Sequence, residues 1–214
     1  MSASSRRPGP LIVLGLLAAV AIAAVVVAVV GGDDVSPDAV KVDGTRTSSA
    51  TLDGELDGFS EGAYFQDLYA QQGIALSESA GSISSRGTVQ WLSYRTQTQL
   101  AERLLDRAGT PLSDATVNAT ARALSQQGIT AGMSSAAADQ LARFSASAEA
   151  LVEELGSYEA YRTAMRRAAR NATIDLDPKY GRWDARQLAF CVPEGCRVGG
   201  QSIVPPPQTS QSGG

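Results

Sequence analysis

An unbroken apolar run stands near the start of the chain. Residues 11–30 are twenty consecutive apolar or glycine residues, without a charge or a proline. A helix of this length, at about 1.5 Å per residue, spans a hydrocarbon core of about 30 Å. Two arginines precede the run and two aspartates follow it. Because positive charges stay on the cytoplasmic side, we expect residues 1–10 to be cytoplasmic and the rest of the chain to lie outside the membrane.

The same run also fits a second interpretation, a cleaved signal peptide. Such a peptide has an apolar part of about 7–15 residues and ends in a small-x-small site. Residues 19–21 and 21–23 have this form, but both lie inside the run, so cleavage there would leave an apolar N-terminus. The length of the run favours an anchor, and both interpretations export the domain that follows.

Short segments of alternating polarity flank the middle of the chain. Residues 40–42 alternate as a half-buried strand does. Asp43 and Gly44 follow as a strong two-residue hairpin signal, and residues 45–47 can form the return strand. Residues 173–176 alternate again. We expect residues 40–42 to pair with 173–176, which would close the two ends of a helical domain.

Between these strands, apolar residues recur with the period of a helix. Serines that can cap a helix precede most of these segments, and glycines that can end a helix follow them. Gly54 and Gly58 weaken the first segment. The expected helices run from Ser48 or Ser49 past Leu56, over 59–72, over 88–108, from Ser113 to Leu124, from Ser134 or Ser135 to Leu155, and from Tyr158 to Arg170.

The fold class that follows is mainly α. We expect a small helical-bundle domain, closed by a short β-hairpin and a returning strand, after one N-terminal transmembrane helix. The expected parts are a cytoplasmic N-terminus 1–10, a transmembrane anchor 11–30, a spacer 31–38, a helical domain 39–184, a disulfide loop 185–198 and a disordered tail 199–214, which is rich in Gly, Ser, Gln and Pro.

The composition excludes several classes of functional site. The chain has no histidine, which removes Ser-His-Asp and Cys-His catalysis and most zinc sites. Its net charge of −4 gives no nucleic-acid signature. No sequence fits the phosphate-binding loop of nucleotide-driven proteins. We therefore expect no catalytic residue, no metal, no cofactor and no nucleic-acid partner.

The chain has two cysteines, Cys191 and Cys196. On the oxidising side of a membrane, such a pair favours a structural disulfide over a redox centre. The Pro-Glu-Gly sequence between them permits a turn, which can bring the two Cα atoms within the roughly 4.4–6.8 Å that a disulfide needs. We expect the two cysteines to be bridged.

Charge is unevenly distributed along the chain. Residues 33–67 contain nine acids and two bases, whereas residues 162–186 contain seven bases and three acids. Two regions of opposite sign can pack against each other. The alternative is that both regions are simply solvated faces of the domain.

Four short segments follow one another in a distinctive order. They are V-K-V-D-G-T-R-T at 40–47, a helix at 100–109 followed by L-S-D-A-T-V at 112–117, an arginine-rich helix at 158–170, and I-D-L-D-P-K-Y-G-R-W-D at 174–184. This order resembles the N-terminal domain of SurA-type periplasmic chaperones and parvulin foldases, including membrane-tethered relatives. The resemblance spans residues 40 to about 184.

The sequence departs from the isomerase members of that family. Their parvulin module needs about 90 residues, the size of a small domain. Only thirty residues follow Asp184, and the chain has no histidine. Asp43 also stands where the family commonly has asparagine. The resemblance therefore implies the chaperone part without the isomerase, and we expect no enzyme activity.

Three functions stay open at this point. The first is a membrane-tethered holdase that binds unfolded exported polypeptides without nucleotide, which needs an exposed, adaptable apolar surface. The second is an envelope adaptor that binds one specific folded partner, with the Pro-rich tail as a candidate binding segment. The third and weakest is an isomerase-related foldase. The residues proposed for peptide contact in the first are Phe59, Tyr64, Phe65, Leu68, Tyr69 and Met133. The alternative for each of these side chains is a place in the core.

Overall fold

The computed structural model describes residues 38–77 and 82–191. The proposed anchor 11–30, most of the spacer 31–38 and the tail 199–214 lie outside the described residues. Within the described ranges, no helix combines the length and the apolar character that crossing a bilayer requires. The anchor and its topology therefore stay predictions.

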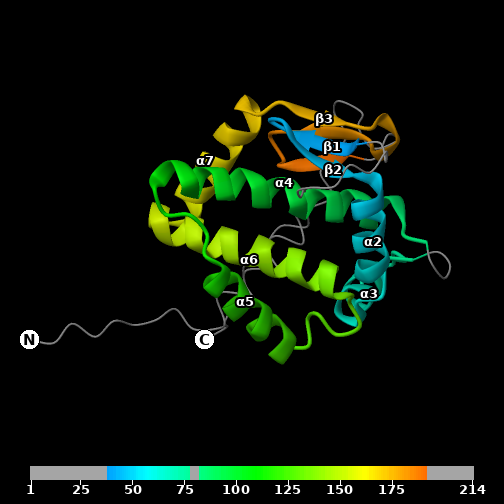
Figure 1. Ribbon diagram of the computed structural model, residues 1–214. Helices are drawn as coiled ribbons and strands as arrows, with labels where there is room; N and C mark the ends of the chain where they lie inside the picture. The colour runs from blue at the N-terminus through cyan, green and yellow to red at the C-terminus, as the bar shows by residue number, and fades with distance from the viewer. Residues whose placement is uncertain (1–37, 78–81, 192–214) are drawn as a thin grey trace, which may run out of the picture.

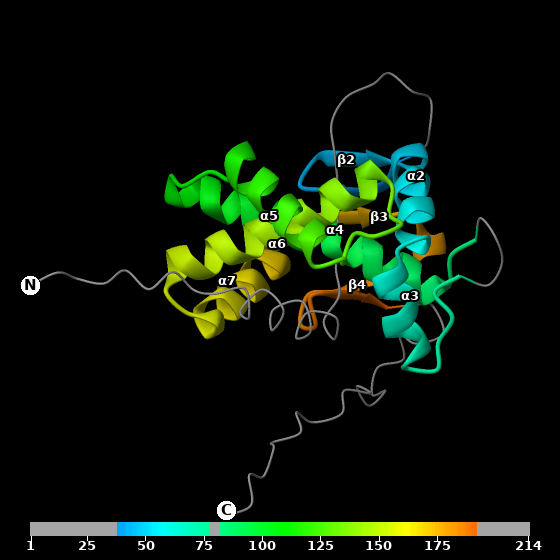
Figure 2. The same ribbon diagram turned by 90° about the horizontal axis from the view of Figure 1, so that it is seen from below.

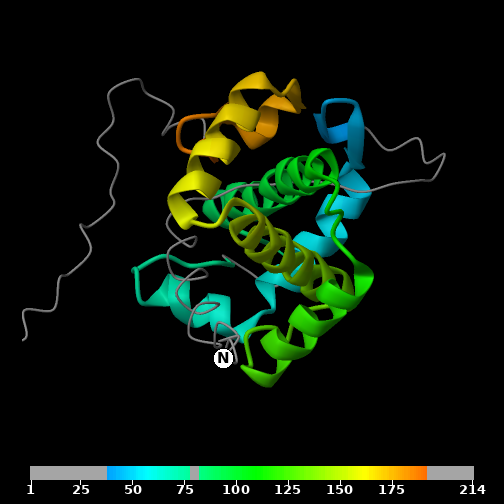
Figure 3. The same ribbon diagram turned by 90° about the vertical axis from the view of Figure 1, so that its left-hand side faces the viewer.

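A mainly helical domain with small antiparallel sheets confirms the predicted fold class of this region. Helices α4 and α6 lie side by side through its middle, and the other helices pack around them (Figures 1 and 3). Residues 91–101 of α4 are all buried, so this helix is the centre of the core. The helices are α2 (Ser49–Ser60), α3 (Ala63–Ala70), α4 (Ser85–Ala108), α5 (Asp114–Gln126), α6 (Ser135–Leu155) and α7 (Tyr158–Asn171), with a short 3-10 turn η1 (Pro178–Tyr180).

The first two strands of the described chain form a three-stranded antiparallel sheet of order β2-β1-β3 with the strand that follows α7. Its strands are β1 (Asp38–Val42), β2 (Thr45–Ser48) and β3 (Ile174–Leu176). In β1, Val40 lies opposite Leu176 and Val42 lies opposite Ile174. The predicted pairing of residues 40–42 with 173–176 is therefore confirmed. A second hairpin, β4 (Arg182–Asp184) with β5 (Ala189–Cys191), follows it.

The predicted Asp43-Gly44 turn joins β1 to β2. Both residues have positive φ, 47° and 94°, which is the backbone of the hairpin turns that these two residue types favour. Arg103 of α4 fixes the turn, because it donates to the Asp43 carboxylate and to the Val42 carbonyl oxygen at 2.5 Å. The Asp43 carboxylate also accepts the Thr173 N–H at 2.6 Å. One aspartate thus links the hairpin both to α4 and to the residue that precedes β3.

Serine caps define most helix starts, as the sequence predicts. The hydroxyls of Ser48, Ser113 and Ser134 each accept a backbone N–H from the first turn of their helix. Helix α4 begins three residues before the predicted start at residue 88, because Ser84 accepts the Gly87 N–H. The sequence just before residue 88 is rich in serine and glycine, so it did not single out Ser84 as the capping residue.

Helix α2 continues through both of its glycines, Gly54 and Gly58. At Gly58, close packing against a neighbouring element explains why a residue without a side chain is needed. A Cβ atom built on Gly58 would lie 1.9 Å from Ser134 Oγ and 2.6 Å from Ser134 Cβ. Ser134 cannot retreat freely, because its hydroxyl caps α6. The missing side chain therefore lets α2 approach the start of α6.

Gly58→Ala is expected to lower the free energy of unfolding by about 1–3 kcal/mol, the usual cost of overpacking. Gly54→Ala is the matched control, because no atom lies within 4 Å of its added Cβ. There the better helix propensity of alanine should stabilise the domain by about 0.5–1 kcal/mol. Urea denaturation measures both. Stabilisation by both substitutions would contradict the close approach at Gly58.

Candidate peptide-binding site

Three of the six residues proposed for peptide contact lie in the core. Phe59, Phe65 and Tyr69 are 0%, 2% and 9% exposed. Phe59 stacks on Trp91 with ring centroids 4.7 Å apart and meets the edge of Phe65 at 4.9 Å. The Phe59 and Phe65 rings therefore hold α2 and α3 on α4 and offer little surface to a ligand.

The other three proposed residues are half-buried, with Tyr64 and Leu68 one turn apart on α3 and Met133 just before α6. Tyr64 packs edge-on against Phe65, with centroids 5.2 Å apart. Met133 lies against Gly62 at the turn between α2 and α3, where an added Cβ would be 2.9 Å from Met133 Cγ. Leu68 lies in the wall of a pocket, together with Tyr69.

This pocket opens between α3, the first half of α4 and β5. Its volume is about 180 Å³. A cavity of about 150 Å³ in a protein core can hold a benzene molecule, so this one is large enough for one leucine-sized or aromatic side chain. The lining consists of Leu68, Tyr69, Gln72, Ile74, Arg86, Val89, Gln90, Tyr94 and Phe190.

Most of the lining could not be found from the sequence. Phe190 belongs to the predicted disulfide loop, far in sequence from Leu68 and Tyr69, and reaches the pocket because β5 packs on α4. Figure 2 shows the β4–β5 hairpin beside α4, which β5 contacts. Trp183 of β4 packs on Phe190, with ring centroids 5.0 Å apart. The only hint in the sequence that this hairpin could contribute to a site was its two aromatic residues, Trp183 and Phe190.

The pocket has one charged wall residue, Arg86, and two phenols. Burial raises the pKa of Tyr69 well above its ordinary value, and the nearby Arg86 guanidinium only partly offsets this. Burial likewise raises the pKa of Tyr94. Both hydroxyls therefore stay protonated at neutral pH, and Arg86 provides the charge of the site.

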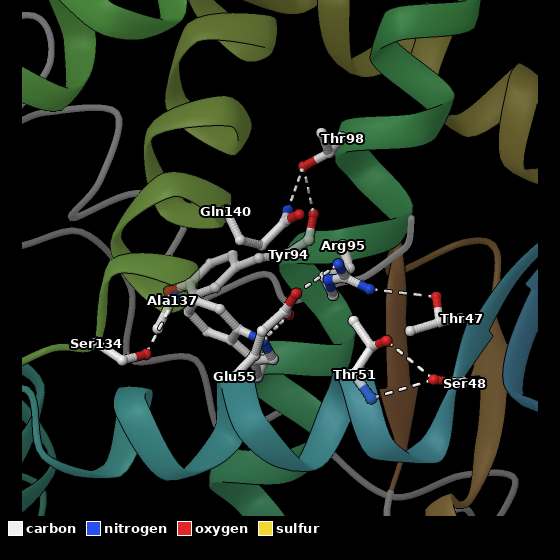
Figure 4. A network of polar contacts seen from close by, with 11 residues as sticks. Thr47, Ser48, Thr51, Glu55, Tyr94, Arg95, Thr98, Ser134, Ala137 and Gln140 are labelled. Carbon is white, nitrogen blue, oxygen red and sulfur yellow. Dashed lines mark hydrogen bonds and ion pairs between the residues drawn. The ribbon is translucent and has the colours of Figure 1, made fainter. Parts of the chain in front are cut away.

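A buried ion pair lies deeper in the core, where α2, α4 and β2 meet (Figure 4). Arg95 Nη2 donates to Glu55 Oε1 at 2.6 Å, and Trp91 Nε1 donates to Glu55 Oε2 at 2.9 Å. Arg95 Nη1 also donates to Thr47 Oγ1 at 3.2 Å. Burial raises the pKa of Glu55, although Arg95 opposes the change, and burial lowers the pKa of Arg95.

The side chains of Glu55 and Arg95 are 6% and 1% exposed, respectively, so a dissolved ligand does not reach them. The contacts join three elements that are distant in the sequence. We therefore assign the pair to the framework of the domain and not to the site.

The described residues include only one of the two cysteines of the predicted disulfide. Cys191 ends β5 and is disulfide-bonded. Its expected partner, Cys196, lies outside the described residues, so the pairing stays a prediction. Across residues 38–77 and 82–191, no three acidic or cysteine side chains are grouped to hold a metal ion.

The comparisons with known proteins give no relative. No family model, no curated protein and no solved structure matches the chain. The SurA-type resemblance therefore stays a prediction.

Proposed function

We propose that this chain is a membrane-tethered, extracytoplasmic holdase that binds unfolded segments of exported polypeptides without nucleotide. The supporting observation is the pocket between α3, α4 and β5. Its walls include Leu68 and Tyr69, two of the residues that the sequence singles out. Leu68, Ile74 and Val89 are half-buried, so apolar surface at this pocket is accessible to a ligand.

The size of the pocket fits reversible binding. Burying one large apolar side chain stabilises a complex by about 1.5–3 kcal/mol, which is about a 10- to 150-fold gain in affinity. Part of that gain is offset by the ordering of the bound segment. A single contact of this strength dissociates readily. A client can therefore leave by diffusion, as a chaperone without a nucleotide cycle requires.

The test is suppression of aggregation of an unfolded protein by the soluble fragment 33–214. The fragment contains every described strand and helix, including the β1–β3 pair that closes the domain. We expect the fragment to suppress aggregation without ATP. Leu68→Gln should weaken suppression severalfold, because it places an amide in the apolar wall.

Leu155→Gln is the matched control. Leu155 is 38% exposed at the end of α6 and does not line the pocket. This substitution should leave suppression unchanged, and circular dichroism should show intact helices in both variants. Equal loss in both variants would assign binding to general surface apolarity instead of the pocket.

Other outcomes distinguish the remaining functions. If the fragment neither suppresses aggregation nor binds unfolded peptides, the holdase proposal is wrong. If deletion of residues 199–214 abolishes capture of a specific partner while the fold persists, the adaptor is favoured. Catalytic acceleration of proline-limited refolding would show that the expected lack of enzyme activity is wrong.

A further inference from the structure

Arg86 lies at an unusual place for a cation. It occupies the first turn of α4, where the helix dipole is positive and where anionic side chains are normally favoured. That turn contains no acidic residue. In the described ranges, no carboxylate forms an ion pair with Arg86. The charge of the guanidinium and the helix dipole thus add at the rim of the pocket.

A second polar group lies one turn further along the same helix face. Gln90 lines the pocket four residues after Arg86, with Val89 beside it. The Gln90 side-chain amide lies near the Tyr94 hydroxyl, but its buried Nε2 makes no hydrogen bond of normal geometry. This amide N–H can donate to a ligand in the pocket in place of its contact with the Tyr94 hydroxyl.

We propose that the pocket binds the C-terminal residue of a polypeptide, with its apolar side chain inside and its terminal carboxylate on Arg86 and the Gln90 amide. This inference rests on the proposed function of the same pocket. The site places apolar wall residues, among them Leu68 and Val89, in the same pocket as a positive charge. In a polypeptide, an apolar side chain and a carboxylate belong to one residue only at the C-terminus. An internal Asp or Glu would bring its charge without the apolar side chain.

The experiment compares two forms of one labelled, unstructured peptide that ends in leucine. One form has a free C-terminal carboxylate and the other is amidated. The full chain is incorporated in lipid nanodiscs, and empty nanodiscs measure partition of the peptide into lipid. Fluorescence anisotropy should show that the amidated form binds about fivefold more weakly, as expected for a partly exposed charge pair.

Arg86→Gln should remove the difference between the two forms, so that both bind as the amidated form binds the unchanged protein. Arg122→Gln is the matched control, because Arg122 is exposed on α5, away from the pocket. It should keep the full preference. Helix content and the urea midpoint should be the same in both variants, which excludes a general loss of structure.

Several results would overturn the inference. Equal binding of the two forms to the unchanged protein, with Leu68→Gln weakening both, would refute it and leave the holdase proposal intact. Absence of binding by either form, together with no suppression of aggregation, would refute both. Arg86-dependent binding of decanoate without any preference for the free peptide carboxylate would reassign the pocket to small fatty acids.

Discussion

Replacing Arg95 by methionine is expected to lower the free energy of unfolding by about 3–5 kcal/mol at neutral pH. The substitution keeps an apolar side chain of similar reach but leaves the Glu55 carboxylate buried without its cation. A domain has only about 5–15 kcal/mol of stability in total. Urea denaturation should therefore show a much lower midpoint or, at the extreme, an unfolded protein.

The loss in Arg95→Met should depend on pH. Burial raises the pKa of Glu55, and removing the guanidinium raises it further. A carboxyl with a higher pKa in the folded state favours folding below its unfolded pKa, and this contribution is lost as the pH rises through the folded pKa. The variant should therefore be closer to the unchanged protein at about pH 4.5 than at pH 7.

The double variant Arg95→Met with Glu55→Gln is the control for this prediction. The side-chain amide oxygen that Glu55→Gln introduces can still accept from Trp91 Nε1, and no buried charge is left. The double variant should recover much of the lost stability and should lose the pH dependence. A single variant with the same loss at both pH values would show that the stranded carboxylate is not the cause.

Replacing Trp91 by alanine is expected to lower the free energy of unfolding by about 3–5 kcal/mol. Trp91 is 0% exposed, stacks on Phe59 and meets the edge of Tyr94, with ring centroids 6.2 Å apart. The alanine variant loses these contacts and leaves a cavity at the junction of α2 and α4. It also removes the N–H donor of the Glu55 carboxylate.

Trp91→Phe separates the contribution of aromatic packing from that of the hydrogen bond to Glu55. It retains an aromatic ring against Phe59 but removes the hydrogen bond to a charged group, so a smaller loss of about 1.5–3 kcal/mol is expected. Trp183→Ala is the matched control, because Trp183 is only half-buried in β4. Urea denaturation should rank the losses with Trp91→Ala first. A larger loss from Trp183→Ala would contradict the place of Trp91 at the centre of the core.

The local sequence determined the ends of the elements. Asp43-Gly44 predicted the hairpin because its two positive φ angles suit these residue types. Ser48, Ser113 and Gly109 marked helix ends because their capping geometry depends on residues only a few positions away. The pairing of residues 40–42 with 173–176 could also be predicted, because two alternating segments that flank a helical domain have few other partners.

Only the tertiary structure decided which side chains form the site. Helix α4 buries polar residues such as Arg95 and Thr98, which by their polarity alone would be expected on a solvated face. Phe59 and Phe65 point into the core instead of a cleft, whereas Phe190 reaches the pocket from a distant hairpin. Hydrophobic period and caps are properties of neighbouring residues. The face that one element presents to another depends on long-range packing. The pocket forms only because α3, α4 and β5 come together from distant parts of the sequence.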